Sequence, residues 1–300
     1  MATTPPRILS APRVVGDVRA TLGEGLCWST RQQAIWWVDI LEHRLYRDAA
    51  AGAHDAWSFD ETISAVAERA DGPGLAVTLR RGLALFDPAT RALVRLDEPE
   101  RERAGNRFND GKCDAQGRFW GGTMDFAVRE PTGAFYRFDA AGRAERAIDP
   151  GWIVTNGPTW TLDGRTMFVN DTVRRRVVAH AFDPATGAVG AARDWLAFGE
   201  ADGHPDGMTT DAAGRLWIAH WGGACVSCHD PHTAAELCRI ELPTSHITDC
   251  AFGGPDLQTL FITSATSGLT PAQRQVEPLA GGLFAVRVDA VGLPASMFGA

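Results

Sequence analysis

A short apolar run recurs six times along the chain, and the starts of successive runs are separated by 40 to 49 residues. Gly, Asp and Pro residues separate the runs, and no long stretch shows helical periodicity. A unit of this length with about four short strands is typical of one blade of a β-propeller. The six runs are residues 35–38, 75–78, 119–122, 167–170, 216–219 and 260–263.

A second strand-like segment follows each run, which gives six copies of one unit. The sequence therefore predicts an all-β fold, a six-bladed β-propeller, with residues 1–300 forming a single domain that includes a short leader at about residues 1–12. A two-sheet sandwich is the alternative, but it does not require a fixed period over the whole chain. Propellers close by pairing one end of the chain with the other, so residues 13–20 are expected to join the last blade.

Composition narrows the class of partner. The net charge is −8 and is spread along the chain, which argues against nucleic acid as the main partner. The N-terminus has no apolar segment typical of a secretory signal, and no apolar stretch is long enough to cross a bilayer. We therefore expect a cytoplasmic protein with no membrane partner; the sequence does not specify an oligomeric state.

The chain has six cysteines, which are expected to be free thiols because a large core needs no disulfides. The spacing Cys225-x-x-Cys228, followed by His229 and His232, leaves a weak zinc site as the alternative.

Polar residues recur at one position of the repeat, on the innermost strand that lines the channel of a propeller. Ten or eleven residues before the start of each run, five of the six blades carry Glu, Asn or Asp, whereas the second blade has Ser64 or Ala65. Carboxylates buried together require a cation, and oxygen ligands suit a hard divalent ion. The sequence thus predicts a metal site on the axis. The five residues are Glu24, Asn109, Asn156, Asp206 and Asp249.

The stretch 202–208 shows what the repeat adds to a single residue. Taken alone, Asp206 beside Gly207 is ordinary turn chemistry. The period instead places Asp206 on the channel axis with Glu24 and Asn156. The comparison between repeats assigns no role to Asp202 or His204, so both are expected at the rim of the channel. The alternative for His204 is a role as a base.

Four short motifs contain these residues in order: Leu22-Gly23-Glu24-Gly25, Arg107-Phe108-Asn109-Asp110-Gly111-Lys112, Asn156-Gly157-Pro158 and Pro205-Asp206-Gly207-Met208. On these motifs the chain resembles the gluconolactonase/regucalcin family of six-bladed propellers over nearly its whole length. The resemblance implies one divalent ion held by Glu24, Asn156 and Asp206. It also implies hydrolysis of a sugar lactone to the aldonic acid.

The resemblance further implies that Arg107 and Asn109 bind the hydroxyl groups of the substrate. Some family members also bind substrate through an acid soon after the segment that corresponds to Gly122-Thr123-Met124. Here the aligned position carries Ala127, so Asp125 is the candidate replacement.

We accordingly expect a metal-dependent sugar lactonase that acts on an aldono-1,4- or 1,5-lactone. The ion would polarise the lactone carbonyl, and Asp206 would both bind the ion and transfer a proton. Calcium is the expected ion, with zinc, manganese, magnesium and iron(II) as alternatives. An esterase or phosphotriesterase on the same site, or a calcium-binding propeller without activity, remains open. Arg107, Asn109 and Lys112 favour an enzyme because they could contact a substrate.

Overall fold

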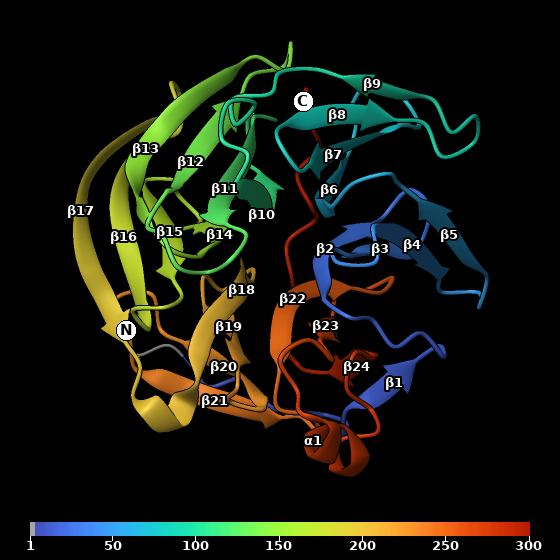
Figure 1. Ribbon diagram of the computed structural model, residues 1–300. Helices are drawn as coiled ribbons and strands as arrows, with labels where there is room; N and C mark the ends of the chain where they lie inside the picture. Colours follow the sequence, from blue (N-terminus) through green and yellow to red (C-terminus); the bar gives the residue numbers. More distant parts are fainter. Residues whose placement is uncertain (1–3) are drawn as a thin grey trace.

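The computed structural model describes residues 4–300, whose strands form six four-stranded antiparallel sheets around a central axis (Figure 1). The protein is a six-bladed β-propeller, as the sequence period predicts. In five blades the strands follow the chain from the axis outward. The six apolar runs all lie on second strands, which pack between the channel strand and the outer half of each blade.

Each of the six blades contains four strands, from the innermost strand outward. The first three are β2 (Gly23–Ser29), β3 (Ala34–Asp39), β4 (Arg44–Ala49) and β5 (His54–Ser58); β6 (Ile63–Glu68), β7 (Leu75–Leu79), β8 (Leu83–Phe86) and β9 (Leu93–Arg95); and β10 (Asn106–Cys113), β11 (Phe119–Asp125), β12 (Gly133–Phe138) and β13 (Ala144–Trp152). The last three are β14 (Thr155–Trp160), β15 (Thr166–Asp171), β16 (Arg176–Asp183) and β17 (Ala188–Ala197); β18 (His204–Thr210), β19 (Leu216–Trp221), β20 (Cys225–His229) and β21 (Glu236–Glu241); and β22 (Ile247–Gly253), β23 (Thr259–Ser264), β24 (Leu283–Arg287) and β1 (Arg13–Val15). A 3₁₀ turn, η1 (Glu200–Asp202), precedes β18, and a short helix, α1 (Pro271–Val276), separates β23 from β24.

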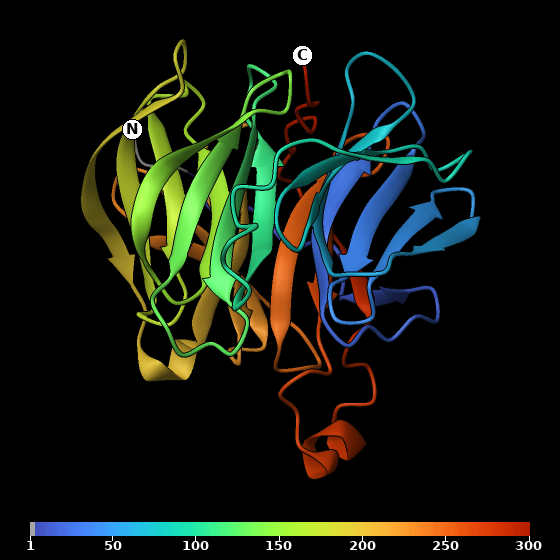
Figure 2. The ribbon, with the colours of Figure 1, turned by 45° about the horizontal axis from the view of Figure 1, so that its top comes forward.

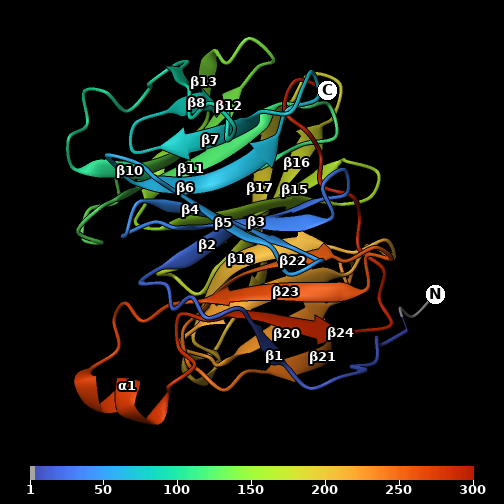
Figure 3. The ribbon, with the colours of Figure 1, turned by 90° about the vertical axis from the view of Figure 1, so that its right-hand side faces the viewer.

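The N-terminal segment closes the ring. β1 pairs antiparallel with β24, with Arg13 opposite Ala285, and the two strands lie side by side in Figure 3. The backbone N–H of Leu9 donates to the carbonyl of Arg287, so part of the leader extends this pairing. The predicted closure of the last blade is confirmed for residues 13–15; residues 1–3 of the leader lie outside the described residues.

A repeated turn anchors two of the second strands. The carboxylate of Asp211 accepts hydrogen bonds from Arg215 Nε at 2.6 Å and from Trp217 Nε1 at 2.9 Å. The turn, the arginine and the buried indole are thereby fixed together, since each donor meets a charged acceptor. The third blade repeats the arrangement with Asp114, Arg118 and Trp120.

The core lies between neighbouring blades and contains most of the large aromatic side chains. Trp36, Trp37, Trp120 and Trp217 are almost fully buried, so these tryptophans serve blade packing, as their place in the apolar runs suggests. All six cysteines are free thiols, and Cys238 alone among them is not fully buried. Within residues 4–300, no helix is long and apolar enough to cross a membrane.

Burial of His220 makes the stability of the fold depend on pH. Its Nδ1 lies 2.9 Å from the carbonyl oxygen of Asp202 and its Nε2 lies 2.6 Å from Ser227 Oγ. Burial lowers the pKa of His220 to about 4. The unfolded chain, with a histidine pKa of about 6.5, therefore binds more protons between these values. The contribution of His220 to stability is complete above about pH 6.5 and declines as the pH falls towards 4.

His220→Gln is accordingly expected to flatten the decline in unfolding free energy between pH 7 and pH 5, by up to about 1.4 kcal/mol per pH unit. Urea denaturation at both pH values measures it. His54→Gln, in which an exposed imidazole is replaced, is the comparison for removing a histidine outside the core. An unchanged slope in His220→Gln would contradict the assignment.

Candidate functional site

A cavity of about 430 Å³ opens at one end of the central channel. Its floor is formed by Glu24, Arg107, Asn109, Asn156 and Asp206, which come from the N-terminal halves of β2, β10, β14 and β18. Ser267, from the β23–β24 connection that carries α1, lines the same cavity. Figures 2 and 3 show α1 projecting from one face of the molecule and the C-terminus at the opposite face. The cavity therefore opens on the α1 face.

A β-bulge places these side chains. Each of the six innermost strands loses register with its second strand at this level, for example between Glu24 and Cys27 in β2 and between Pro205 and Met208 in β18. A bulge adds residues on one strand and turns side chains away from the regular alternation. Glu24 and Asn156 are the last paired residues before the bulge, whereas Asn109 and Asp206 lie inside it. All four nevertheless reach the same cavity.

Asp249 does not line this cavity, although the spacing of the repeat groups it with the other four. It is the second residue of the bulge in β22, one position further along the strand than Asp206 is in β18. Its carboxylate accepts hydrogen bonds from the backbone N–H groups of Leu26 and Cys250 at 2.9 and 2.8 Å. The bulges in β18 and β22 are the same size, but the β22–β23 hairpin is longer: two residues past the bulge, Phe252 pairs with Leu260, whereas Thr210 pairs with Leu216. A similar step in sequence therefore reaches one layer deeper in β22, at Asp249.

A chain of hydrogen bonds orients the polar floor. Arg107 Nη1 donates to Asn109 Oδ1 at 2.6 Å, and Asn109 Nδ2 donates to Asn156 Oδ1 and to the carbonyl of Thr155, both at 2.8 Å. Asn156 Nδ2 then donates to Thr172 Oγ1 at 2.9 Å. Both amide hydrogens of Asn109 are thus committed. The Asn156 oxygen is held in place and keeps a second lone pair for another partner.

Two carboxylates of the floor are buried without enough counter-charge. Burial first, and then repulsion between neighbouring carboxylates, raises the pKa of Glu24 and of Asp206 well above the usual range. Arg107 opposes this effect on both groups. Its own pKa is lowered by burial to about 10, so the guanidinium is still a cation at neutral pH. Carboxylates that repel each other in a cleft are a recognised sign of a functional site.

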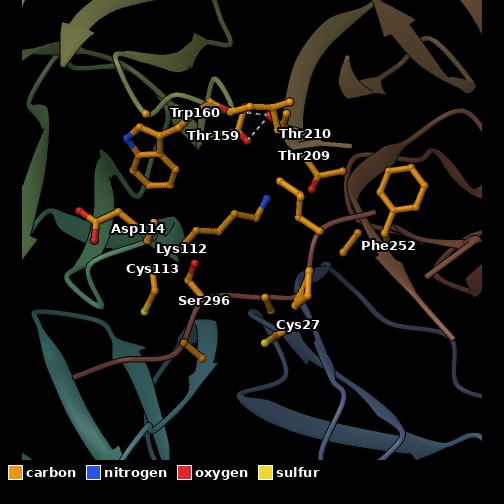
Figure 4. Close-up of a pocket in the computed structure, with 18 of the residues that line it drawn as sticks. Cys27, Lys112, Cys113, Asp114, Thr159, Trp160, Thr209, Thr210, Phe252 and Ser296 are labelled. Atoms are coloured by element: carbon orange, nitrogen blue, oxygen red, sulfur yellow. Dashed lines mark hydrogen bonds between the residues drawn. The ribbon is translucent and has the colours of Figure 1, made fainter. Parts of the chain in front are cut away.

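A second charged layer lies beneath the floor and contains Asp110, Asp249 and Lys112. Lys112 Nζ is 3.8 Å from Asp249 Oδ1 and donates to the carbonyl of Met208. Lys112 lines a separate cavity of about 370 Å³, which the C-terminal halves of the same inner strands and residues 293–296 enclose (Figure 4). The expectation that Lys112 contacts a substrate beside Arg107 is therefore wrong, because its ammonium group belongs to the opposite end of the channel.

The donor set fits a hard divalent cation. Glu24 Oε2 is buried and has no hydrogen-bond partner among residues 4–300. In the two layers, four carboxyl groups face two cations, Arg107 and Lys112, so ionisation of all four would leave two negative charges for a bound cation to compensate. Within the described part of the chain, no three His, Cys, Asp or Glu side chains gather into a metal site. An ion here would use the amide oxygen of Asn156 beside the carboxylates of Glu24 and Asp206, an oxygen-only set suited to calcium or magnesium.

Asp125 does not line the cavity. One carboxylate oxygen accepts hydrogen bonds from the backbone N–H groups of Arg129 and Glu130 at 2.9 and 3.1 Å. These bonds hold the turn that follows β11. The geometry gives Asp125 a part in shaping the rim and does not support direct contact with a substrate.

His204 lies in the wall of the cavity. Its Nδ1 is 2.9 Å from the carbonyl oxygen of Thr172 and donates to it, which leaves Nε2 as the remaining polar atom of the ring. Asp202 lies away from the cavity and pairs with Arg239 at 3.0 Å.

Sequence reasoning missed Thr172 and Phe126. Thr172 follows the Asn170-Asp171 end of β15 and joins Asn156 to β18 by accepting from the amide and donating to the carbonyl of Pro205 at 2.8 Å. Phe126 lines the cavity with its ring centroid 5.7 Å from the Arg107 guanidinium carbon. Both residues follow second strands, and the repeat directed attention only to inner ones.

Residues 22–266 match the family described as the SMP-30/gluconolactonase/LRE-like region. The chain belongs to this family. The matched segment contains all of the floor residues. The pentonolactonase XacC of Haloferax volcanii is 35% identical over 293 residues, covering 95% of this chain and 97% of the relative. The L-arabinolactonase of Azospirillum brasilense is 34% identical over 288 residues, covering 95% and 94%.

The chain is also similar to proteins named regucalcin. The Gallus gallus regucalcin is 33% identical over 278 residues, which cover 91% of this chain and 92% of the relative. The crystal structure of a calcium-binding protein, regucalcin, from Agrobacterium tumefaciens superposes with a TM-score of 0.91 at 28% identity, covering 99% of each chain. The fold and the family are therefore shown over almost the full length.

Proposed function

We propose that this protein is a metal-dependent lactonase that opens a sugar lactone to its aldonic acid. The observation that carries the proposal is the convergence of two repelling carboxylates, Glu24 and Asp206, and one oriented amide oxygen beside the buried Arg107 guanidinium. Relatives named pentonolactonase and L-arabinolactonase support the reaction class.

Glu24, Asn156 and Asp206 would hold one divalent ion. When bound, the ion would supply Lewis-acid stabilisation of the negative charge that develops on the lactone carbonyl. Calcium is the first candidate, supported by the oxygen-only donor set and by the calcium-binding relative of similar structure. Asn109 orients the amide of Asn156 through its own Nδ2, so Asn109 contributes to the set indirectly.

The chain's own groups would bind the substrate and move the proton. Arg107 would hold a hydroxyl or the ring oxygen through its guanidinium, and Asn109 would meet the substrate only through its carbonyl oxygen. Asp206 would accept a proton from the attacking water and return it to the ring oxygen as the ester bond breaks. The products balance as one hydroxy acid from one lactone and one water.

Acid release from a panel of sugar lactones tests this proposal. The protein loaded with calcium is expected to accelerate hydrolysis of at least one aldono-1,4- or 1,5-lactone above the spontaneous rate, as followed by titration at constant pH. Chelation should abolish the acceleration, and added calcium should restore it. Parallel assays with zinc, manganese, magnesium and iron(II) would identify the preferred ion.

Each negative result has a distinct meaning. Full activity after exhaustive chelation would contradict metal dependence. Calcium binding measured by calorimetry, without hydrolysis of any lactone in the panel, would instead favour a calcium-binding propeller. Hydrolysis of aryl esters or phosphotriesters in preference to every lactone would favour the alternative reaction on the same site.

A further inference from the structure

The walls of the cavity differ chemically from its floor. Charged and amide groups occupy the floor, whereas hydrocarbon side chains form most of the wall between the floor and solvent. These wall residues come from loops and strand ends of several blades rather than from one strand. They include Leu41, Phe126, Val128, Val154, Val173 and Trp221.

Three of these apolar side chains are exposed at the mouth. Phe126, Val128 and Val173 have 42%, 48% and 36% of their surface accessible, so they are not buried parts of the blade core. They lie in the loops after β11 and β15, on the same face as the cavity opening. Exposed apolar residues grouped around a cavity mark a binding surface more often than scattered ones do.

The backbone conformation of Val128 supports a role for the apolar wall in ligand binding. Val128 has a φ of 56°, in the left-handed region that a β-branched residue rarely adopts. Its N–H donates to the carbonyl of Asp125 at 3.0 Å, while the Asp125 carboxylate holds the next two N–H groups. The turn is thus fixed by Asp125 in a conformation that glycine or asparagine would adopt more easily. A valine in this backbone conformation, with its side chain in a cavity wall, points to contact with a ligand.

Few polar groups of the wall are free to bind hydroxyl groups. Thr172 Oγ1 already accepts from Asn156 and donates to Pro205, and His204 Nδ1 is committed to the carbonyl of Thr172. Among residues 4–300, three polar side-chain groups of the wall have no hydrogen-bond partner: His204 Nε2, the Ser267 hydroxyl and the Trp221 indole N–H. A substrate hydroxyl placed against the remaining wall would be desolvated without a hydrogen bond, which disfavours binding.

We infer that the preferred substrate is a lactone whose end remote from the carbonyl is apolar, as in a deoxy sugar lactone with a terminal methyl group. This inference rests on the proposed function. The carbonyl and the ring hydroxyls face Glu24, Arg107 and Asp206 on the floor. The terminal carbon faces the part of the wall formed by Phe126, Val128 and Val173, where a methyl group is accommodated and a hydroxymethyl group finds no polar side chain.

A matched pair of substrates tests the inference on the wild-type protein. L-galactono-1,4-lactone and L-fucono-1,4-lactone differ by one hydroxyl group, on carbon 6. With the preferred ion present, kcat/KM is expected to be at least about tenfold higher for the deoxy lactone, the discrimination that one small group in an apolar pocket provides. A ratio of one or less, with metal-dependent hydrolysis of both lactones, overturns the substrate class and leaves the proposed function intact. Failure to hydrolyse any lactone overturns both.

Substitutions in the apolar wall test whether these side chains cause the preference for the deoxy lactone. Val128→Thr and Val173→Thr change one methyl group to a hydroxyl at nearly constant volume, so the double variant is expected to lower the ratio at least about threefold, mainly through KM for the deoxy lactone. Val94→Thr makes the same change on β9, where the side chain is 57% exposed and remote from the cavity, and should leave the ratio unchanged. An unchanged ratio in the double variant would show that this wall does not select the substrate.

Discussion

Asp206→Asn is expected to lower kcat/KM for lactone hydrolysis by about 10³-fold or more. The substitution preserves shape but removes a charge from the proposed ion site and the group proposed to transfer the proton. A general base alone contributes about 10²- to 10⁴-fold, and loss of a metal ligand adds to this effect. Initial rates at saturating calcium, together with calcium affinity from calorimetry, measure both consequences. Glu24→Gln is expected to weaken calcium binding similarly while retaining more of the rate at very high calcium concentration.

The control variant changes Asp202, which lies in the same stretch as Asp206, residues 202–208. Asp202 lies four residues earlier and is paired with Arg239 at the surface, away from the cavity. Asp202→Asn should therefore keep kcat/KM and calcium affinity within about twofold of the wild-type values, since a surface ion pair contributes little. If Asp206→Asn matched this control in rate, the assignment of Asp206 to proton transfer would be wrong.

The sequence repeat was enough to predict the propeller fold. It was also enough to predict that four residues far apart in the sequence lie close together, because the fold and the position of each residue within its blade both follow from the period. Each blade is one supersecondary unit, so a 40–49-residue period in apolar runs specifies the fold without any detail of side-chain contact. The same period placed Glu24, Asn109, Asn156 and Asp206 at one end of the channel, which the structure confirms.

Bulges limited what the period could specify within a strand. Asp249 lies at a similar step from its apolar run, yet it is the second residue of the bulge in β22, whereas Asp206 is the first in β18, so Asp249 lies one layer below the cavity. Lys112 follows Asn109 by three residues, but β10 continues through the bulge and carries its ammonium group to the other mouth. Register shifts of one residue are not visible in hydrophobic periodicity, because the core-facing pattern resumes after each bulge.

The rim could not be predicted from periodicity at all, because loops lie outside the repeat. Asp125 was assigned to the substrate by its proximity to the family acid, but its carboxylate accepts two backbone hydrogen bonds in the turn. Phe126 and Val128, on either side of Ala127, are the residues that line the cavity. Only the three-dimensional path of the turn, including the left-handed Val128, shows which side chains face inward.

Charge balance in the channel leads to a second large effect, on stability. Without a bound ion, four carboxyl groups share the buried layers with two cations, so each carboxyl group beyond the second either carries an uncompensated charge or must be protonated. Asp206→Asn removes the cost of burying this carboxyl group beside Asp110 and Asp249, so it is expected to stabilise the metal-free protein at pH 8, by about 1.4 kcal/mol for each unit by which burial and repulsion raise the pKa of Asp206. The variant would then be more stable than wild type and inactive.

Calcium should reverse that order. At a calcium concentration of 100 times the dissociation constant, the wild-type protein gains about 2.7 kcal/mol, because the ion binds the folded state and not the unfolded chain. Asp206→Asn should gain much less at the same concentration, whereas Asp202→Asn should gain as much as wild type. Urea denaturation with calcium and with chelator measures all three proteins.

An equal calcium increment in Asp206→Asn and wild type would place the ion elsewhere. A metal-free Asp206→Asn variant less stable than wild type would show that the charges in the channel are already balanced. The joint outcome, higher stability without calcium and lower stability with it, is specific to a carboxylate retained for a cation, because a residue retained for packing or hydrogen bonding would destabilise the fold under both conditions.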